Sequence, residues 1–132
     1  MGTFKNVKEA REYMSGDRFA MSCGVTLDEL TEDGAVCSLI LGEDHRNAHG
    51  GVMGGVIFTL ADFAFACAAN QIHRPTVAQQ ESSYFLSAPK GTRLIARAAC
   101  RKNGRGSTGV TVDVADDAGR DVAAFIFTGY KL

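Results

Sequence analysis

The chain has 132 residues, a length typical of one domain and too short for a separate cofactor-binding module. Hydrophobic residues make up 45% and charged residues 22%, which excludes a disordered protein and indicates a soluble globular one. The formal net charge of -1 argues against nucleic acid or an anionic membrane as a partner, because no long-range field attracts either. We therefore expect a single domain over residues 1–132.

Cysteine and histidine positions argue against a metal site. The cysteines are spread along the chain without the close pairs that a zinc site needs: Cys23, Cys37, Cys67 and Cys100. His45 and His49 are four residues apart, but glycines follow them and no carboxylate pattern supports a metalloprotease helix. The first residues contain no apolar signal-peptide core, so we expect a cytoplasmic protein with buried free thiols.

The N-terminal part predicts one short helix and two strands. Apolar and charged residues alternate at helical spacing over residues 6–14, and Gly16 is a suitable helix stop. Residues 25–30 and 35–41 read as two strands, and the Asp33-Gly34 pair between them indicates a tight turn.

After a glycine-rich connection over residues 43–51, the chain becomes apolar on every side. Residues 52–69 include only Thr59 and Asp62 as polar side chains, and the pattern ends near Asn70. A helix that is apolar all round must be buried all round. Because a carboxylate stands at its middle, we predict a buried central helix and not a membrane span.

The C-terminal half has the period of two that is typical of strands. Asn103-Gly104 predicts a hairpin turn with positive φ, and a further turn is expected over residues 116–119. The predicted strands form a meander of four, over residues 76–86, 93–101, 107–114 and 121–130.

Together these elements predict an α+β fold, in which a curved antiparallel sheet of about five or six strands wraps one long helix. A single sheet covers only one side of that helix. The other side must therefore face a partner, which predicts at least a homodimer.

Asp62 is the residue that most needs an explanation, since a buried unpaired carboxylate costs several kcal/mol. It has three interpretations. Its oxygens accept hydrogen bonds from backbone amides or pair with an arginine; it lies on a wet edge of the helix; or it lines a pocket as an acid, base or nucleophile. Perturbed ionisable groups cluster at functional sites, which favours the third.

The entry to the long helix, residues 47–55, is rich in glycine. Unpaired N–H groups at a helix start can hold an oxyanion, although Gly54 and Gly55 also allow close packing with no function. Asp62 follows Gly54 by eight residues, roughly 12 Å along a helix axis. One chain cannot bring both groups to one small substrate, whereas two antiparallel helices in a dimer can.

Residues 47–62 resemble the hotdog-fold acyl-CoA thioesterases of the phenylacetate-degradation, or PaaI-like, branch. Their signature is N-x-x-G-x-x-H-G-G, with an acidic residue nine positions after the histidine. Counting back nine from Asp62 gives Met53, with Asn47 six and Gly50 three residues before it. Met53 therefore stands where the family has histidine, and His49 is not the equivalent residue.

The resemblance implies a hotdog fold and assigns roles to several residues. Asp62 is the nucleophile or general base, the partner subunit's Gly54 amide binds the oxyanion, and Asn47 orients the lytic water or the thioester oxygen. Substrate contacts are expected from the helix entry, at Met53 and Gly55, and from a hairpin arginine, Arg105. Polar residues of the strand after the helix are expected to add contacts, namely Gln80 and Ser83, with Gln79 and Ser82 as further candidates.

The sequence thus predicts a thioester hydrolase that acts on acyl-CoA, with no metal and no cofactor because coenzyme A is part of the substrate. Two alternatives stay open: a hotdog hydratase-dehydratase acting on enoyl or 3-hydroxyacyl thioesters, and a non-catalytic acyl-CoA-binding module. The acyl chain length and the choice between a dimer and a dimer of dimers cannot be read from the residues.

Overall fold

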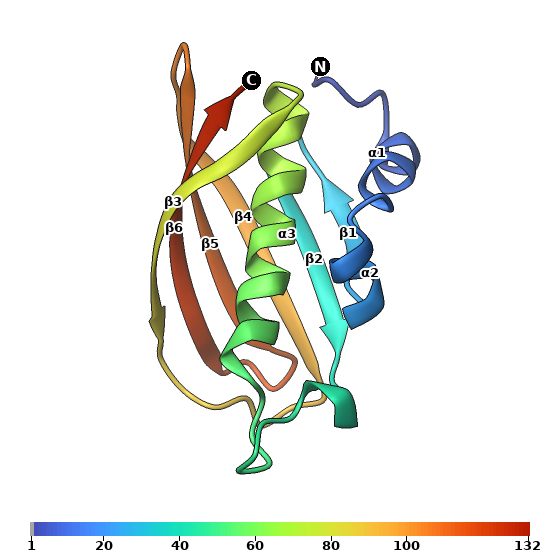
Figure 1. Ribbon diagram of the computed structural model, residues 1–132, viewed down its shortest axis with the longest axis vertical. Coiled ribbons are helices and arrows are strands. Elements are labelled where there is room, and N and C mark those ends of the chain that lie inside the picture. The colour runs from blue at the N-terminus through green and yellow to red at the C-terminus, as the bar shows by residue number, and fades with distance from the viewer. Residues whose placement is uncertain (1) are drawn as a thin grey trace.

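The computed structural model describes residues 2–132 and has the expected α+β architecture. A curved antiparallel sheet of six strands, in the order β1-β2-β4-β5-β6-β3, wraps one long helix, α3 (Gly54–Ile72) (Figure 1). The termini lie at the same end of the sheet, where α3 also ends (Figure 1). The prediction of a sheet around a central helix is confirmed.

The N-terminal segment contains two helices where the sequence predicted one. α1 (Val7–Met14) begins at Asn6, whose side-chain oxygen accepts the N–H of Glu9 at 2.9 Å. α2 (Arg18–Cys23) has only six residues and ends at Gly24, which adopts the left-handed conformation at φ 88°. A single turn and a half shows too little periodicity to be read from sequence.

The two helices lie beside the edge of the sheet formed by β1 (Thr26–Leu30) and β2 (Gly34–Ile40) (Figure 1). A short 3-10 turn, η1 (Glu43–His45), follows β2 and leads to the entry of α3. His45 fixes this turn, because its ring receives the N–H of Gly42 at 3.0 Å and contacts the Cys23 carbonyl at 2.8 Å.

α3 is buried on the sides that face the sheet and open along one stripe. Leu60, Ala61 and Ala64 are fully buried against the sheet. By length and composition alone, α3 could cross a membrane, but 67% of its most apolar 18-residue segment is buried inside the protein. The open stripe contains Thr59 and Asp62, both half-buried.

The remaining strands are β3 (Thr76–Phe85), β4 (Arg93–Asn103), β5 (Ser107–Asp116) and β6 (Asp121–Lys131). The expected four-stranded meander is wrong, since β3 pairs with β6 at the edge while β4 pairs with β2. Residues 86–92 carry the chain from one edge to the middle of the sheet. Of these four strands, β4, β5 and β6 are joined as consecutive hairpins, whereas β3 is not paired with its successor β4.

The expected positive φ in the β4–β5 turn is also wrong. Positive φ occurs at Gly24, Gly50 and Gly119 among the described residues, and not at Gly104. Three residues, 104–106, separate the two strands, and this longer loop does not need the left-handed turn of a two-residue hairpin. Gly119, in the β5–β6 turn, is the glycine that adopts it.

A buried carboxylate fastens the loops at one end of the sheet. Asp116 is 2% exposed, and its oxygens accept N–H groups from Lys90, Gly91, Ala118 and Arg120 at 2.7–3.1 Å. The N–H groups of Arg120, Gly91 and Lys90 lower the pKa of Asp116 to about 2. The carboxylate therefore holds the β5–β6 turn against the segment that leads into β4.

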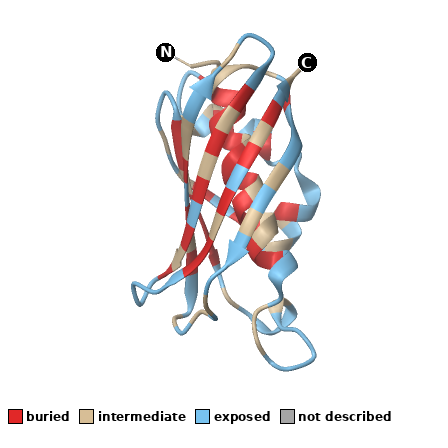
Figure 2. Ribbon diagram, turned by 90° about the vertical axis from the view of Figure 1, so that its left-hand side faces the viewer, coloured by how far each residue is buried: buried red, intermediate tan, exposed pale blue. Residues whose placement is uncertain are grey.

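Buried and exposed residues alternate along the strands, as a half-buried sheet requires (Figure 2). Phe127 is fully buried at the middle of the core and stacks on Phe65, with ring centroids 4.7 Å apart. All four cysteines are free thiols; Cys37 and Cys67 are buried, while Cys23 and Cys100 are half-buried.

Candidate active site

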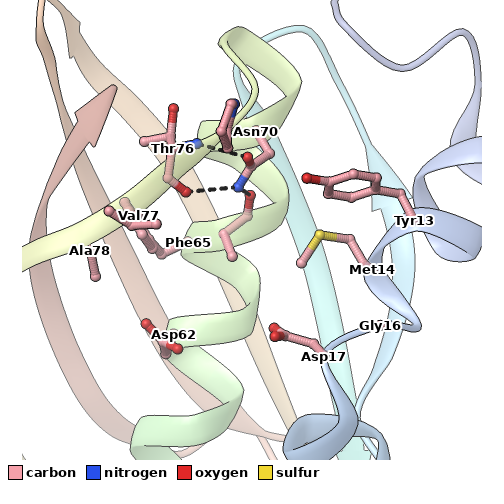
Figure 3. A pocket seen from close by; sticks show the side chains of 12 residues that line it. Tyr13, Met14, Gly16, Asp17, Asp62, Phe65, Asn70, Thr76, Val77 and Ala78 are labelled. Carbon is pink, nitrogen blue, oxygen red and sulfur yellow. Dashed lines mark hydrogen bonds between the residues drawn. The ribbon is translucent and has the colours of Figure 1, made fainter. Parts of the chain in front are cut away.

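Asp62 projects from the open stripe of α3 and lines two cavities. The first, of about 450 Å³, lies between the α1–α2 turn, α3 and the start of β3 (Figure 3). Its walls include Tyr13 and Met14 of α1, Phe65 and Asn70 of α3 and residues 75–78. Asn70 joins the end of α3 to β3, because its side chain donates to the Thr76 carbonyl at 3.1 Å and accepts the Thr76 N–H at 3.0 Å.

The second cavity, also of about 450 Å³, lies between α2 and the first half of α3. Its walls are largely apolar: Phe19, Ala20 and Cys23 from α2, and Val56, Phe58 and Phe63 from α3. Met53 and Gly55, two of the expected substrate-binding residues, line it near the start of α3. The unpredicted helix α2 thus supplies one wall of the apolar cavity.

The carboxylate of Asp62 is half-buried and unpaired. Neither an amide nor an arginine is bonded to it among residues 2–132, so the first of its three interpretations is not seen in the single chain. Burial, and to a smaller extent the charges of Asp17 and Glu81, raise its pKa to about 6. At neutral pH the group is mostly ionised and yet binds a proton readily.

Asp17 and Glu81 reach this region from different elements, and neither was predicted as a site residue. Asp17 comes from the α1–α2 turn and extends toward α3, on which Asp62 lies (Figure 3). Glu81 lies on β3 directly opposite Phe127, so it shares the helix-facing side of the sheet. One of its oxygens, Oε1, is buried without a hydrogen-bond partner in the described chain. Three carboxylates therefore influence this region, and none of them takes part in the ion pairs found within residues 2–132.

Gly54 is the first residue of α3, and Met53 is its N-cap residue. The N–H groups of Gly54 and Gly55 belong to the first turn, where the helix itself provides no acceptor. No other backbone acceptor within the described chain is bonded to them, and both glycines are exposed. These two donors are therefore available to a ligand or to a partner, but they are eight residues from Asp62 in the same helix.

Asn47 lies in the exposed loop before α3 and organises it. Its Oδ1 accepts the N–H of His49 at 2.9 Å and that of Gly51 at 3.1 Å. The amide nitrogen makes none of the hydrogen bonds found within residues 2–132. His49 is exposed. Across residues 2–132 no group of three or more His, Cys, Asp or Glu side chains has an arrangement that could hold a metal ion.

The strand candidates lie on opposite faces of β3. Ser83 is opposite Phe125 and shares the helix-facing side, whereas Gln80 is opposite Thr128 and its Nε2 lies 3.3 Å from the Ser82 hydroxyl on the outer side. A bulge between Ala78 and Gln80 reverses the alternation at this point. Arg105 lies in the β4–β5 turn, at the opposite end of the sheet from Gly54 (Figure 1).

The helix-wrapping sheet and the carboxylate on the open face of α3 define a hotdog-fold protein with an acidic site. The Thioesterase superfamily profile matches residues 49–123, which include most of the entry of α3, Asp62, strands β3 to β5 and the first residues of β6. The chain belongs to this superfamily, and it is a hydrolase with thioesterase function.

Known proteins support the same assignment. A Deinococcus radiodurans protein named an esterase is 32% identical over 117 residues, 88% of this chain and 80% of its own length. The E. coli PaaI protein of the phenylacetic acid degradation operon superposes with a TM-score of 0.88 at 26% identity, over 93% of this chain and 90% of PaaI. A hypothetical thioesterase protein from Streptococcus pneumoniae, whose structure was solved with coenzyme A, superposes with a TM-score of 0.81 at 24% identity. The match covers 89% of this chain and 94% of the pneumococcal chain, and it shows the shared fold.

Proposed function

We propose that this protein is an acyl-CoA thioesterase, and that Asp62 is its catalytic carboxylate. The observation that carries the proposal is a half-buried carboxylate between two cavities, with which no group within residues 2–132 forms an ion pair or a hydrogen bond. Such an arrangement costs stability, so a structural role does not account for it. A substrate or water molecule in the cavity is the natural partner of the two oxygens.

The proposed chemistry needs few groups because a thioester carbonyl is already electrophilic. With a pKa of about 6, Asp62 is ionised at neutral pH and can take the proton of a water molecule while that water attacks the carbonyl carbon. The tetrahedral intermediate then expels the coenzyme A thiolate, which takes up a proton. Direct attack by Asp62 as a nucleophile, through a mixed anhydride that water hydrolyses, uses the same residue.

The oxyanion donor is proposed to come from a second subunit. The Gly54 N–H has no acceptor within residues 2–132, and it lies at a helix N-terminus, where the partial positive charge favours a developing anion. Within one chain Gly54 and Asp62 are eight residues apart on the same helix, roughly 12 Å along its axis. Two antiparallel copies of α3 bring the Gly54 of each copy toward the Asp62 of the other.

A homodimer is also supported by the free edge of the sheet. β3 has only β6 as a neighbour, and it exposes apolar side chains: Val77 at 46%, Tyr84 at 74% and Phe85 at 55%. An unpaired apolar edge strand is a site for pairing with another chain. Phe85 lies beside Gly54, since a Cβ at Gly54 would be 3.6 Å from its ring, so a partner on this edge would also reach the helix entry. Further pairing into a dimer of dimers is compatible with this.

The remaining expected residues keep supporting roles in the proposal. The free amide nitrogen of Asn47 is assigned to the lytic water or the thioester oxygen, while its Oδ1 shapes the loop. Gly55 and Met53 border the apolar cavity, and Ser83 faces the helix side of the sheet. Gln80 and Arg105 lie away from Asp62 in one chain, so any substrate contact from them requires the partner subunit. Coenzyme A, which the pneumococcal protein holds, is the proposed carrier and part of the substrate, and no cofactor is needed.

The test is release of free coenzyme A thiol from a panel of acyl-CoA thioesters, followed with a thiol-reactive dye. We expect hydrolysis by the wild type and a loss of at least about 100-fold in Asp62→Asn, as for removal of a positioned base. Asp113→Asn, which removes an exposed carboxylate from the outer face of β5, is the matched control and should keep full activity. Equal rates for the wild type and Asp62→Asn would refute the assignment.

The same assay separates the two alternatives. Turnover of an enoyl or 3-hydroxyacyl thioester without thiol release would identify a hydratase-dehydratase; neither cavity beside Asp62 is lined by the histidine that such chemistry pairs with a carboxylate. Tight acyl-CoA binding without thiol release over hours would identify a binding module instead.

A further inference from the structure

Asp17 occupies a position that its local structure does not explain. It is the N-cap residue of α2, where aspartate commonly bonds a backbone N–H of the first turn, but its side chain makes no such bond. Neither of the ion pairs found within residues 2–132 involves Asp17; they join Arg74 to Glu9 and Arg93 to Asp28. The carboxylate is therefore available for an effect on its surroundings.

Those surroundings are the two cavities beside Asp62. Asp17 lines both of them, and its side chain extends from the α1–α2 turn toward α3 (Figure 3). Asp62 is the other acidic residue that both cavities share. A substrate group that occupies either cavity beside Asp62 therefore shares that cavity with the carboxylate of Asp17.

The rest of the wall has no positively charged side chain that would attract an anion. The second cavity is lined mainly by aromatic and aliphatic side chains, and neither cavity has a lysine, an arginine or a histidine on its wall. The third carboxylate of the region, Glu81, adds to the negative potential. Apolar walls suit an uncharged acyl group, while the two acidic residues at the shared boundary oppose a negatively charged one.

We propose that Asp17 is a specificity-determining residue that makes the enzyme select uncharged acyl groups and reject acyl groups ending in a carboxylate. This inference rests on the proposed thioesterase function and deepens it, since it names the chemical class of the acyl group. We expect Asp17 alone to lower the kcat/KM of a carboxylate-ended acyl group about tenfold relative to an uncharged one, which equals about 1.4 kcal/mol. Two like charges several ångströms apart in a partly solvated cavity repel each other by about this much.

The experiment compares three thioesters with six-carbon acyl groups: hexanoyl-CoA, 6-hydroxyhexanoyl-CoA and adipoyl-CoA. The coenzyme A charge is the same in all three, so their kcat/KM ratios isolate the end of the acyl chain. The enzymes are the wild type, Asp17→Asn and Glu12→Gln. Glu12 is an exposed carboxylate on α1 that lines neither cavity, and it therefore controls for a change of net charge. Asp17→Asn should fold, because the side chain makes no capping bond.

The expected result is that the wild type discriminates against adipoyl-CoA more than against 6-hydroxyhexanoyl-CoA. Asp17→Asn should narrow the hexanoyl-to-adipoyl ratio by about tenfold and leave the hexanoyl-to-hydroxyhexanoyl ratio unchanged, while Glu12→Gln changes neither. A higher salt concentration should also reduce the hexanoyl-to-adipoyl ratio of kcat/KM in the wild type, because salt screens the repulsion between the two carboxylates.

Three outcomes would overturn the inference while leaving thioesterase function intact: equal use of hexanoyl-CoA and adipoyl-CoA, equal rejection of the hydroxyl and carboxyl groups, or an unchanged adipoyl ratio in Asp17→Asn. Absence of thiol release from every acyl-CoA in the wider panel would instead refute the proposed function, and the inference with it.

Discussion

Replacing Asp62 by asparagine should stabilise the protein at neutral pH while it removes thioesterase activity. The two side chains have nearly the same shape, so the substitution mainly deletes the charge. The folded state raises the pKa of Asp62 from 3.8 to about 6, and burial is the largest cause. The ionised group therefore opposes folding, and an amide at the same position does not.

The magnitude follows from the linkage between proton binding and folding. A shift of roughly two pKa units corresponds to about 3 kcal/mol, and the partial exposure of the side chain reduces this to about 1–2 kcal/mol at pH 7.5. That gain corresponds to a rise in Tm of about 3–8 °C for a chain of this size.

The sign of the pH dependence provides a second check. Between about pH 4 and pH 6 the folded wild type binds the proton more tightly than the unfolded chain, so its stability falls as the pH rises through this window. The advantage of Asp62→Asn should therefore be fully present above pH 6 and disappear below about pH 4.

The measurement is urea unfolding at pH 7.5 and pH 4 and at a fixed protomer concentration, followed by far-ultraviolet circular dichroism because the chain has no tryptophan. Asp113→Asn, an exposed carboxylate, is the matched control and should change stability little at either pH. A variant that is less stable than the wild type at pH 7.5, or equally stabilised at both pH values, would show that the charge of Asp62 does not oppose folding.

Three further expectations concern pH and packing. The kcat/KM of the wild type should fall about tenfold per pH unit below pH 6, because Asp62 becomes protonated there. In Asp17→Asn this fall should begin at a lower pH, but still above the ordinary pKa of an aspartate, since burial is the larger cause of the raised pKa. A pH–rate profile of each enzyme checks both expectations. Asp116→Asn should lower Tm at pH 7 and make Tm depend less on pH in acid. The reason is that a carboxylate with a lowered pKa contributes its full stabilisation above about pH 4 and loses it as the pH falls toward 2. An unchanged Tm at pH 7 would contradict this. Phe127→Ala should cost about 3–5 kcal/mol by denaturant unfolding, as expected for a fully buried ring that stacks on Phe65.

The central helix and its acidic residue could be predicted because their signals are local and strong. An apolar run of this length in a globular protein is best explained by a buried helix. Asp62 is easily recognised in it because it is the one charged residue of the run. The glycines of residues 47–55 likewise indicate the helix entry, and α3 begins within it at Gly54, two residues after the predicted apolar run starts. These features depend on neighbours in sequence, so no knowledge of the tertiary arrangement was needed.

Features that depend on distant pairing could not be predicted. β3 was expected beside β4 because consecutive strands are usually neighbours, yet the sheet brings it to β6 at the far edge. The side on which Gln80 and Ser83 lie follows from a one-residue bulge, which reverses every later side chain on the strand. Asp17 carries no local signal at all, because its importance comes only from the position of the α1–α2 turn over α3.

The most direct test of the proposed site is complementation between two inactive variants. Gly54→Pro deletes one N–H and little else, since proline is well tolerated at the first position of a helix and Met53 before it is already extended, at ψ 134°. Gly54→Ala, which keeps the N–H, is the control and should stay active; a Cβ there makes ordinary contact with Phe85 at 3.6 Å.

Asp62→Asn and Gly54→Pro should each be inactive alone, whereas chains unfolded together and refolded at equal amounts should recover about a quarter of the wild-type rate. Half of such dimers are mixed, and each mixed dimer has one intact site with the Asp62 of one subunit and the Gly54 amide of the other. A mixture as inactive as its parents, or a fully active Gly54→Pro, would contradict a site shared between subunits.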